Sequence, residues 1–215
     1  MTVELHGYAY SVYAWIARFA LHEKDVDYTW VEVDPFADDM PAAYLDLHSF
    51  RRVPTLVDGG FTLYETGAIT RYIDDKFDAP ALRPTAPEAR ARVDQILSIV
   101  DSYVYWPLVR QVFSNGVFAV RVGEPVDRAE YDCGLAAAPR VLDALDRLAA
   151  GGDYLVGDAF TLADIHLAPM LSYFSADGGG MALLRQRDRL DTWWSAVSTR
   201  RAFVETKPQL PEPPA

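Results

Sequence analysis

Residues 51–69 combine three features that together could hold a small anionic peptide. Pro54 precedes an apolar run, and Asp58-Gly59 separates that run from a second one, a pattern typical of a β-hairpin. Glu65-Thr66 then stands where an amphipathic helix is expected to begin. The first N–H groups of a helix have no acceptor within it and attract anions. This stretch therefore predicts a strand edge that reads a peptide backbone, beside a helix N-terminus that holds a negative group.

Pro54 is expected to follow a cis peptide bond. An X-Pro bond adopts the cis form at a cost of only ~0.5–1 kcal/mol. On the local sequence alone, a trans proline at the start of a strand is an equal alternative. The Glu65-Thr66 pair downstream favours the cis form.

The first 78 residues predict the elements that must position this stretch. Apolar spacing and β-propensity indicate strands at 2–7, 28–33, 54–57 and 61–64, and helices at 11–24, 38–47 and 66–77. This order, β-α-β and then α-β-β-α, is that of a thioredoxin-like domain.

The remainder of the chain predicts a second, all-helical domain. Three prolines between residues 78 and 87 indicate a linker at 79–87. Patterning is helical from residue 88 to about 204, with turns at Pro125, Gly151-Gly152 and 178–180. We assign 88–207 to the helical domain and 208–215, which holds four prolines, to a surface tail.

Composition restricts the partners. The net charge is −11, of which −8 falls in residues 1–78, and an acidic surface argues against general nucleic-acid binding. No apolar run is long enough for a membrane span, and no signal peptide is visible. The single cysteine, Cys133, excludes an internal disulfide and a Cys-x-x-Cys site, and no spacing indicates a metal site. A cytoplasmic location is expected.

The predicted architecture and two motifs resemble the cytosolic glutathione S-transferases, and most closely their serine-type theta and phi classes. The first motif runs from Val53-Pro54 to Glu65-Thr66, and the second is Tyr-Leu-Val-Gly-Asp-Ala-Phe-Thr-Leu-Ala-Asp-Ile at 154–165. Residues 90–94, at the start of the first long helix, also match. The resemblance implies a homodimeric detoxification enzyme that conjugates the glutathione thiolate to a small, hydrophobic electrophile. Glutathione would be a co-substrate, and no other cofactor is implied.

The resemblance also implies how glutathione is held. Val53 would pair with the cysteinyl backbone, and Thr66 with the helix N–H groups would bind the γ-glutamyl carboxylate. Glu65 would take the ammonium group. Arg51, Arg52 and His48 would face the glycyl carboxylate. The acidic stretch 38–40 would repel that carboxylate, a departure from many relatives.

Ser11 is the candidate catalytic residue, as a hydrogen-bond donor to sulfur. A thiol titrates near ~8.5, and lowering its pKa by about two units requires ~2.7 kcal/mol of preference for the anion. One hydroxyl and the positive end of a helix could supply about that much. A plain N-cap serine is the alternative. Tyr8, Tyr10 and Tyr13 are alternative donors, since other classes of the family use a tyrosine here.

The second-substrate pocket is predicted at Tyr10, Tyr103, Trp106 and Arg110, the last three at helical spacing. An aromatic core stripe is the alternative. Phe50 is either an aromatic key inserted into a partner subunit or a core residue.

Asp101, with Asp94 as an equal competitor, could reach glutathione across the dimer. Two other functions remain open at this point: a glutathione-dependent isomerase, dehalogenase or peroxidase, and a binding module without turnover.

Overall fold

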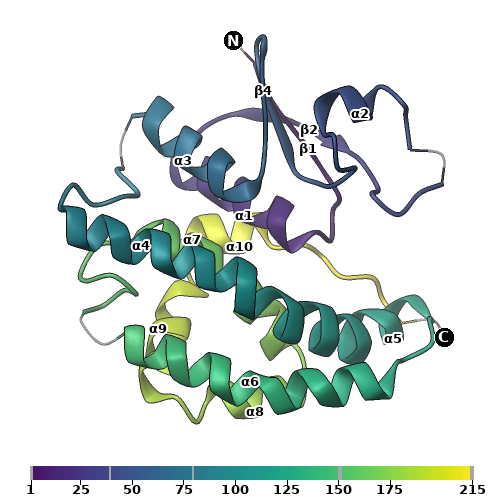
Figure 1. The fold of residues 1–215 in the computed structure, drawn as a ribbon, viewed down its shortest axis with the longest axis vertical. Coiled ribbons are helices and arrows are strands. Elements are labelled where there is room, and N and C mark those ends of the chain that lie inside the picture. The colour runs from purple at the N-terminus through teal and green to yellow at the C-terminus, as the bar shows by residue number, and fades with distance from the viewer. Residues whose placement is uncertain (1, 39, 79, 150–151, 214–215) are drawn as a thin grey trace. The chain divides into compact units, whose positions relative to one another are not determined.

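The computed structural model describes residues 2–38, 40–78, 80–149 and 152–213. The chain divides into two compact units, and Figure 1 labels most of their elements, though not β3 or η1. The first comprises Met1–Leu82 and Glu205–Pro208, and the second comprises Arg83–Val204 and Gln209–Ala215. Asp39 of the acidic stretch, Ala79 of the predicted linker and Gly151 of a predicted turn lie outside the described residues.

The first unit contains a four-stranded mixed sheet with the strand order β2-β1-β3-β4. Its strands are β1 (Val3–Gly7), β2 (Tyr28–Glu32), β3 (Thr55–Asp58) and β4 (Phe61–Tyr64). β1 pairs in parallel with β2 and antiparallel with β3, and β3 and β4 form the predicted hairpin around Gly59, whose φ is 62°. A positive φ favours glycine, which explains the Asp-Gly signal.

The described part of residues 1–82 also forms the helices α1 (Val12–Glu23), α2 (Tyr44–Leu47) and α3 (Thr66–Lys76). The apolar face of α1, including Trp15 and Phe19, is fully buried, and α1 packs against α3. This β-α-β-α-β-β-α order confirms the thioredoxin-like fold that the sequence predicts.

The end of the chain's last helix also belongs to the first unit. Thr206 is fully buried, and its Oγ1 accepts a hydrogen bond of 3.0 Å from Nε1 of Trp15. Glu205 lies 3.7 Å from Nδ1 of His22. The sequence predicts a helical domain that runs to residue 207, because no local pattern indicates a hydrogen bond between Thr206 and a tryptophan 191 positions away.

The second unit is all-helical, as expected. Its elements are α4 (Pro87–Ile99), η1 (Val100–Phe118), α5 (Ala119–Val122), α6 (Arg128–Leu148), α7 (Leu162–Ser175), α8 (Gly178–Leu184), α9 (Asp188–Val197) and α10 (Arg201–Thr206), the last of which extends into the first unit. The segment η1 is a π-helix, a form that the sequence analysis did not predict. At its end the N–H of Ala119 donates to the carbonyl of Ser114, five residues earlier.

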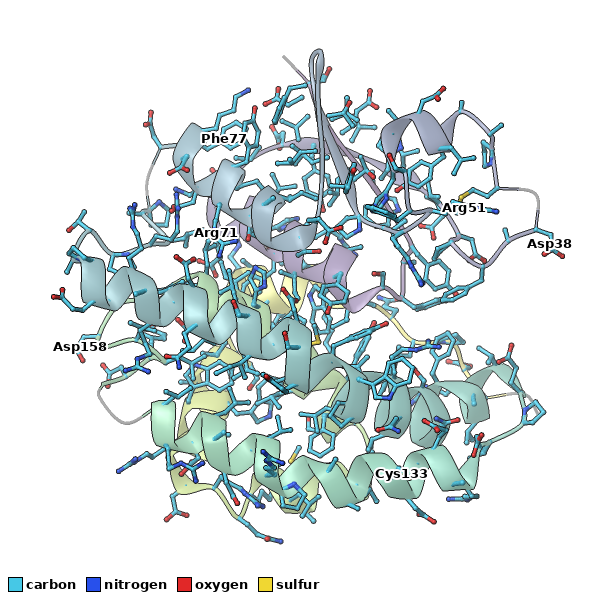
Figure 2. All side chains as sticks on the ribbon, in the orientation of Figure 1. Asp38, Arg51, Arg71, Phe77, Cys133 and Asp158 are labelled. Carbon is cyan, nitrogen blue, oxygen red and sulfur yellow. The ribbon has the colours of Figure 1, made fainter. Side chains whose placement is uncertain are left out.

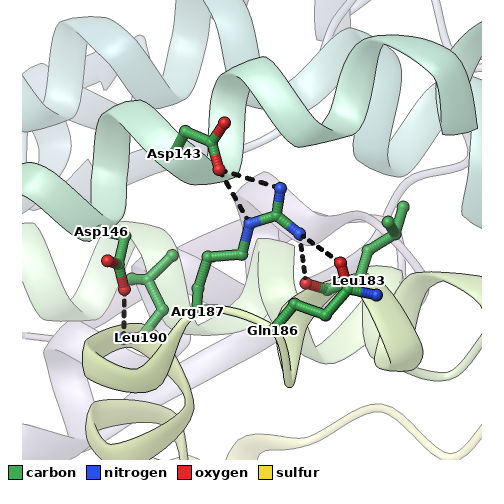
Figure 3. Close-up of polar contacts among 6 residues, drawn as sticks. All are labelled: Asp143, Asp146, Leu183, Gln186, Arg187 and Leu190. Carbon is green, nitrogen blue, oxygen red and sulfur yellow. Dashed lines mark hydrogen bonds and ion pairs between the residues drawn. The ribbon is translucent and has the colours of Figure 1, made fainter.

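Arg187 connects three helices of this unit, as Figure 3 shows. Its guanidinium donates to Oδ1 of Asp143 on α6, at 2.9 and 3.0 Å, and to the carbonyl of Leu183 on α8 at 2.7 Å. Arg187 is also the N-cap residue of α9, and its carbonyl accepts the N–H of Asp191 at 2.8 Å. Nearby, Oδ1 of Asp146 accepts from the N–H of Leu190 at 3.1 Å.

Asp164 organises the second sequence motif from within the core. Its fully buried carboxylate accepts from the N–H groups of Leu155 and Thr161, from the hydroxyl of Thr161 and from Nε1 of Trp193, at 2.7–3.0 Å. Burial raises the pKa of Asp164, while the four donors oppose that shift because each favours the ionised form. Thr161 and Asp164 form a capping box at the start of α7, which gives the motif a structural role.

Among the helices of the described residues, none has the length and apolar character required to cross a membrane.

Candidate active site

The strand edge at Pro54 lies where the sequence predicts it. The Val53–Pro54 bond is cis, which confirms that prediction, and β3 begins directly afterwards at Thr55. The hydroxyl of Tyr44, a residue that the sequence analysis did not single out, donates at 2.8 Å to the carbonyl of Arg52 and lies 2.9 Å from Oγ1 of Thr55. Tyr44 therefore fixes the chain on both sides of the cis bond. Burial raises the pKa of Tyr44, so its hydroxyl stays protonated as a donor.

Glu65 and Thr66 form the N-terminus of α3. Glu65 is the N-cap residue, and its carbonyl accepts from the N–H groups of Ala68 and Ile69, both at 2.9 Å. Its carboxylate is exposed and makes no capping hydrogen bond. The first N–H groups of α3, starting with Thr66, have no acceptor within the helix. The N-terminus of α3 can therefore bind an anion, while the Glu65 carboxylate can bind a cation next to it.

The backbone of Glu65 is strained. Its φ is 70° and its ψ is 110°, a combination that non-glycine residues seldom adopt. Such outliers cluster at ligand-binding sites, where the surrounding structure holds them. The geometry of Glu65 is thus a second indication, independent of the motif, that the start of α3 is a functional site.

The loop before Pro54 presents two exposed cations, Arg51 and Arg52, of which Arg51 is labelled in Figure 2. His48 is only 2% exposed and stacks on Tyr64, with ring centroids 4.4 Å apart. Its Nδ1 accepts the N–H of Phe50 at 3.2 Å. The pKa of His48 is lowered, mainly because burial disfavours the charged imidazolium. The nearby charge of Glu65 raises this pKa and that of Arg52 lowers it, so both charges act on the His48 ring.

A neutral, buried imidazole brings no positive charge to a carboxylate. The two arginines are therefore the stronger candidates for the glycyl end of a peptide, and the role of His48 there stays a prediction.

Ser11 is the N-cap residue of α1, at the end of the loop that follows β1. Its Oγ accepts the N–H of Ala14 at 3.2 Å, and its own N–H donates to the carbonyl of Tyr8 at 2.9 Å. A hydroxyl has one proton and two lone pairs, so the bond from Ala14 leaves the proton able to donate. The capping role and the catalytic role of Ser11 are therefore compatible, although the sequence analysis set them against each other.

The candidate tyrosines flank Ser11 in the sequence, and all three are half-buried. Tyr8 packs edge-on against Tyr10, with centroids 5.3 Å apart, and against Phe36 at 6.1 Å. Tyr13 lies in the first turn of α1. Phe36, an exposed aromatic side chain that the sequence analysis left out, thus extends an aromatic surface next to Ser11.

Glu32, also left out by the sequence analysis, contacts the same loop: its Oε1 accepts the N–H of Ala9 at 2.9 Å. The parallel pairing of β1 and β2 brings the two residues together, because Gly7 and Glu32 are partners in the register.

Tyr103, Trp106 and Arg110 lie on η1 of the second unit. Tyr103 is 64% and Trp106 56% exposed, and Arg110 is exposed as well. The aromatic core stripe, the alternative interpretation of these residues, is therefore wrong. Their place in a second-substrate pocket stays a prediction.

Phe50 is 67% exposed, which likewise excludes the alternative that it is a core residue of this chain. Its side chain contacts His48 and Tyr64 edge-on. Asp101 is exposed on η1, whereas Asp94 is half-buried on α4. Among the described residues, no group of three or more His, Cys, Asp or Glu side chains could hold a metal ion.

The two units and the cis-proline edge define a thioredoxin-like protein with an added all-helical domain. Family models for the glutathione S-transferase N-terminal and C-terminal domains match residues 5–81 and 83–194. Glutathione S-transferase 3 of Zea mays is 31% identical over 196 residues, which cover 90% of this chain and 88% of that protein. The chain belongs to the glutathione S-transferase family.

Solved structures of relatives agree with this assignment. Glutathione S-transferase III in its apo form has a TM-score of 0.84 and 32% identity over all of both chains. A theta class glutathione S-transferase from Xanthomonas axonopodis pv. citri, solved with glutathione bound, has a TM-score of 0.79 and 28% identity, with 95% of this chain and 96% of that one covered. The similarity to these proteins extends through both units.

Proposed function

We propose that this glutathione S-transferase activates the glutathione thiol through the hydroxyl of Ser11 and conjugates the thiolate to a small, hydrophobic electrophile. The observation that carries the proposal is the position of Ser11. It caps α1, it accepts one N–H, and its proton remains able to donate. The positive end of α1 lies at the same place.

The energy required is modest. To lower the thiol pKa by about two units takes ~2.7 kcal/mol, since one unit is about 1.4 kcal/mol. A hydrogen bond to a charged group contributes about 1.5–3 kcal/mol, and a helix terminus about 0.3–1 kcal/mol. Ser11 and α1 together therefore account for the shift without a metal or a second base.

The remaining parts of the site would hold glutathione in place. Val53 offers its backbone to the cysteinyl residue at the strand edge. The start of α3 binds the γ-glutamyl end, with Thr66 on its carboxylate and Glu65 on its ammonium group. Arg51 and Arg52 take the glycyl carboxylate. Thr66 is only 7% exposed, which supports a hydroxyl directed at a bound ligand rather than at bulk water.

The electrophile would meet aromatic surface. Tyr10 lies in the aromatic surface next to Ser11, and Tyr103, Trp106 and Arg110 present exposed side chains on η1. We propose that these residues select flat, hydrophobic substrates, in a detoxification role in the cytoplasm.

Homodimerisation would bury the exposed ring of Phe50 against a partner subunit and bring Asp101 near the partner's ligand. Phe50→Ser should then shift the protein from dimer to monomer in analytical ultracentrifugation. A dimer that is unaffected by this change contradicts the role of Phe50.

Retention on immobilised glutathione and an absorbance titration of the bound thiolate test the function. Ser11→Ala should raise the pKa of the bound thiol by about one unit, equivalent to ~1.4 kcal/mol. The kcat/KM for a standard aromatic electrophile should fall about tenfold. Tyr8→Phe, Tyr10→Phe and Tyr13→Phe should leave the thiol pKa unchanged.

Ser195→Ala is the matched control, because the Ser195 hydroxyl is exposed on α9 of the second unit and donates to the carbonyl of Asp191. A thiol pKa that does not respond to Ser11→Ala refutes the role of Ser11. Retention without any thiol pKa shift in the unmodified protein refutes thiol activation itself.

A further inference from the structure

The loop that carries Ser11 is a tight turn, and one backbone N–H within it, that of Ala9, donates to a side chain outside the turn. The N–H of Ser11 closes the turn on the carbonyl of Tyr8 at 2.9 Å. Ala9, inside the turn, sends its N–H to Oε1 of Glu32 at 2.9 Å. Glu32 ends β2, and its register partner Gly7 ends β1, so the carboxylate lies beside the start of this loop. The turn is therefore attached to the sheet by one side chain from the neighbouring strand.

The second oxygen of the same carboxylate is also occupied. Oε2 of Glu32 accepts the indole N–H of Trp30 at 2.8 Å. This bond fixes the direction of the carboxylate, because both of its oxygens now have a donor. A hydrogen bond to an ionised acceptor is shorter and about twice as strong as a neutral one.

Trp30 is itself held in place by close packing. A Cβ atom built on Gly7 would lie 2.5 Å from Cη2 of Trp30 and 2.9 Å from Cβ of Ala14, so only glycine fits at the end of β1. The guanidinium of Arg18, on α1, lies 5.3 Å from the Trp30 ring. The indole is thus confined between the end of β1 and the side chains of α1. Through its hydrogen bond to Oε2, it holds the Glu32 carboxylate in one position.

We propose that Glu32 is a positioning residue for thiol activation. Its carboxylate connects Trp30 to the N–H of Ala9, and so sets the turn that places the Ser11 hydroxyl against the glutathione sulfur. This inference rests on the proposed role of Ser11. The two hydrogen bonds of Glu32 go to Ala9 and Trp30, neither of which is assigned to glutathione in the proposed site. Its loss should therefore affect kcat and the thiol pKa more than the affinity for glutathione.

The experiment compares Glu32→Ala and Glu32→Gln with Asp27→Ala. Asp27 is an exposed acid just before β2, and its removal changes the net charge equally. Glu32→Ala should lower kcat about five- to tenfold and raise the pKa of bound glutathione, with the KM for glutathione changed less than about twofold. Glu32→Gln keeps one acceptor oxygen for the two donors, so its fall in kcat should be smaller than that of Glu32→Ala. Asp27→Ala should match the unmodified enzyme.

The same changes in a Ser11→Ala background separate positioning from a general structural effect. If Glu32 acts through Ser11, Glu32→Ala should have little further effect once the hydroxyl is gone, a non-additivity that a double-mutant cycle measures. Equal losses in both backgrounds overturn the proposal. So does an unchanged thiol pKa in Glu32→Ala when Ser11→Ala raises it, in which case the function of Ser11 stands.

If Ser11→Ala has no effect on the thiol pKa, the proposed function and this inference fall together. Circular dichroism and urea unfolding identify a variant that fails to fold. If Glu32→Ala does not fold, Glu32→Gln supplies the same comparison, because it keeps the shape of the side chain.

Discussion

The strained backbone of Glu65 predicts that stability and ligand binding oppose each other at this residue. A non-glycine residue at a φ of 70° and a ψ of 110° costs about 1–3 kcal/mol. Glu65→Gly removes the Cβ atom and with it the steric cost. Glu65→Ala keeps the Cβ atom and the strain. Both variants lose the carboxylate, so the difference between them isolates the backbone.

The expected difference follows from two terms of opposite sign. Relief of strain favours the glycine variant by about 1–3 kcal/mol, and the greater chain entropy of unfolded glycine disfavours it by about 0.5–1 kcal/mol. Glu65→Gly should therefore be more stable than Glu65→Ala by about 1 kcal/mol. Urea unfolding gives the comparison from the two midpoints, provided that the m-values agree.

Both variants should bind glutathione about tenfold more weakly, because each loses one charge-assisted contact to the ammonium group of the ligand. Asp25, which follows α1 and has a φ of 53°, supplies the matched control. Asp25→Gly should likewise be more stable than Asp25→Ala, but neither should alter glutathione affinity. The reasoning is refuted if Glu65→Ala is as stable as Glu65→Gly, or if either Glu65 variant binds glutathione normally.

Two further predictions concern buried carboxylates. Asp164→Ala leaves four donors in the core without their acceptor, so urea unfolding should show a loss of about 3–5 kcal/mol in the free energy of unfolding. The control Asp153→Ala, at an exposed residue, should change it by less than about 0.5 kcal/mol. Asp58 accepts from Lys76 and Tyr72, and the hydrogen bond from Lys76 lowers the pKa of Asp58. Because the folded-state pKa of Asp58 is lowered, its ionised carboxylate stabilises the fold above the unfolded pKa of about 3.9, and this stabilisation is lost as the pH falls below that value. The destabilisation caused by Asp58→Asn, measured by urea unfolding at a series of pH values, should therefore be full at pH 7 and shrink below about pH 4. An equal effect at pH 7 and pH 3 contradicts this.

Local patterns predict most of the fold, because the signals involved extend over only a few residues. The alternation in β1, the apolar face of α1 and the Asp-Gly turn each depend on near neighbours. The cis bond at Pro54 was predictable for a similar reason, since proline permits it and the downstream pair favours it. The position of Ser11 as the N-cap of α1 also follows from its place before an apolar helical face.

The features that the sequence did not reveal depend on contacts between distant residues. Glu32 and Ala9 are 23 positions apart, and their hydrogen bond exists only because the register pairs the ends of β1 and β2. Tyr44 is recognisable as a support of the cis-proline loop only once α2 is placed beside β3. The positive φ of Glu65 likewise follows from the path of the chain between β4 and α3. Glutamate is not a residue type that indicates a positive φ, so the sequence does not reveal it.

The hydrogen bond between Trp15 and Thr206 has a consequence for the order in which the chain folds during synthesis. Trp15 is fully buried, and its indole N–H has its acceptor on a segment made about 190 residues later. Burial of that N–H without an acceptor would cost about 1–3 kcal/mol. The glutathione-binding unit therefore completes its core only after residue 206 has left the ribosome, although its sheet has been available since Tyr64 emerged.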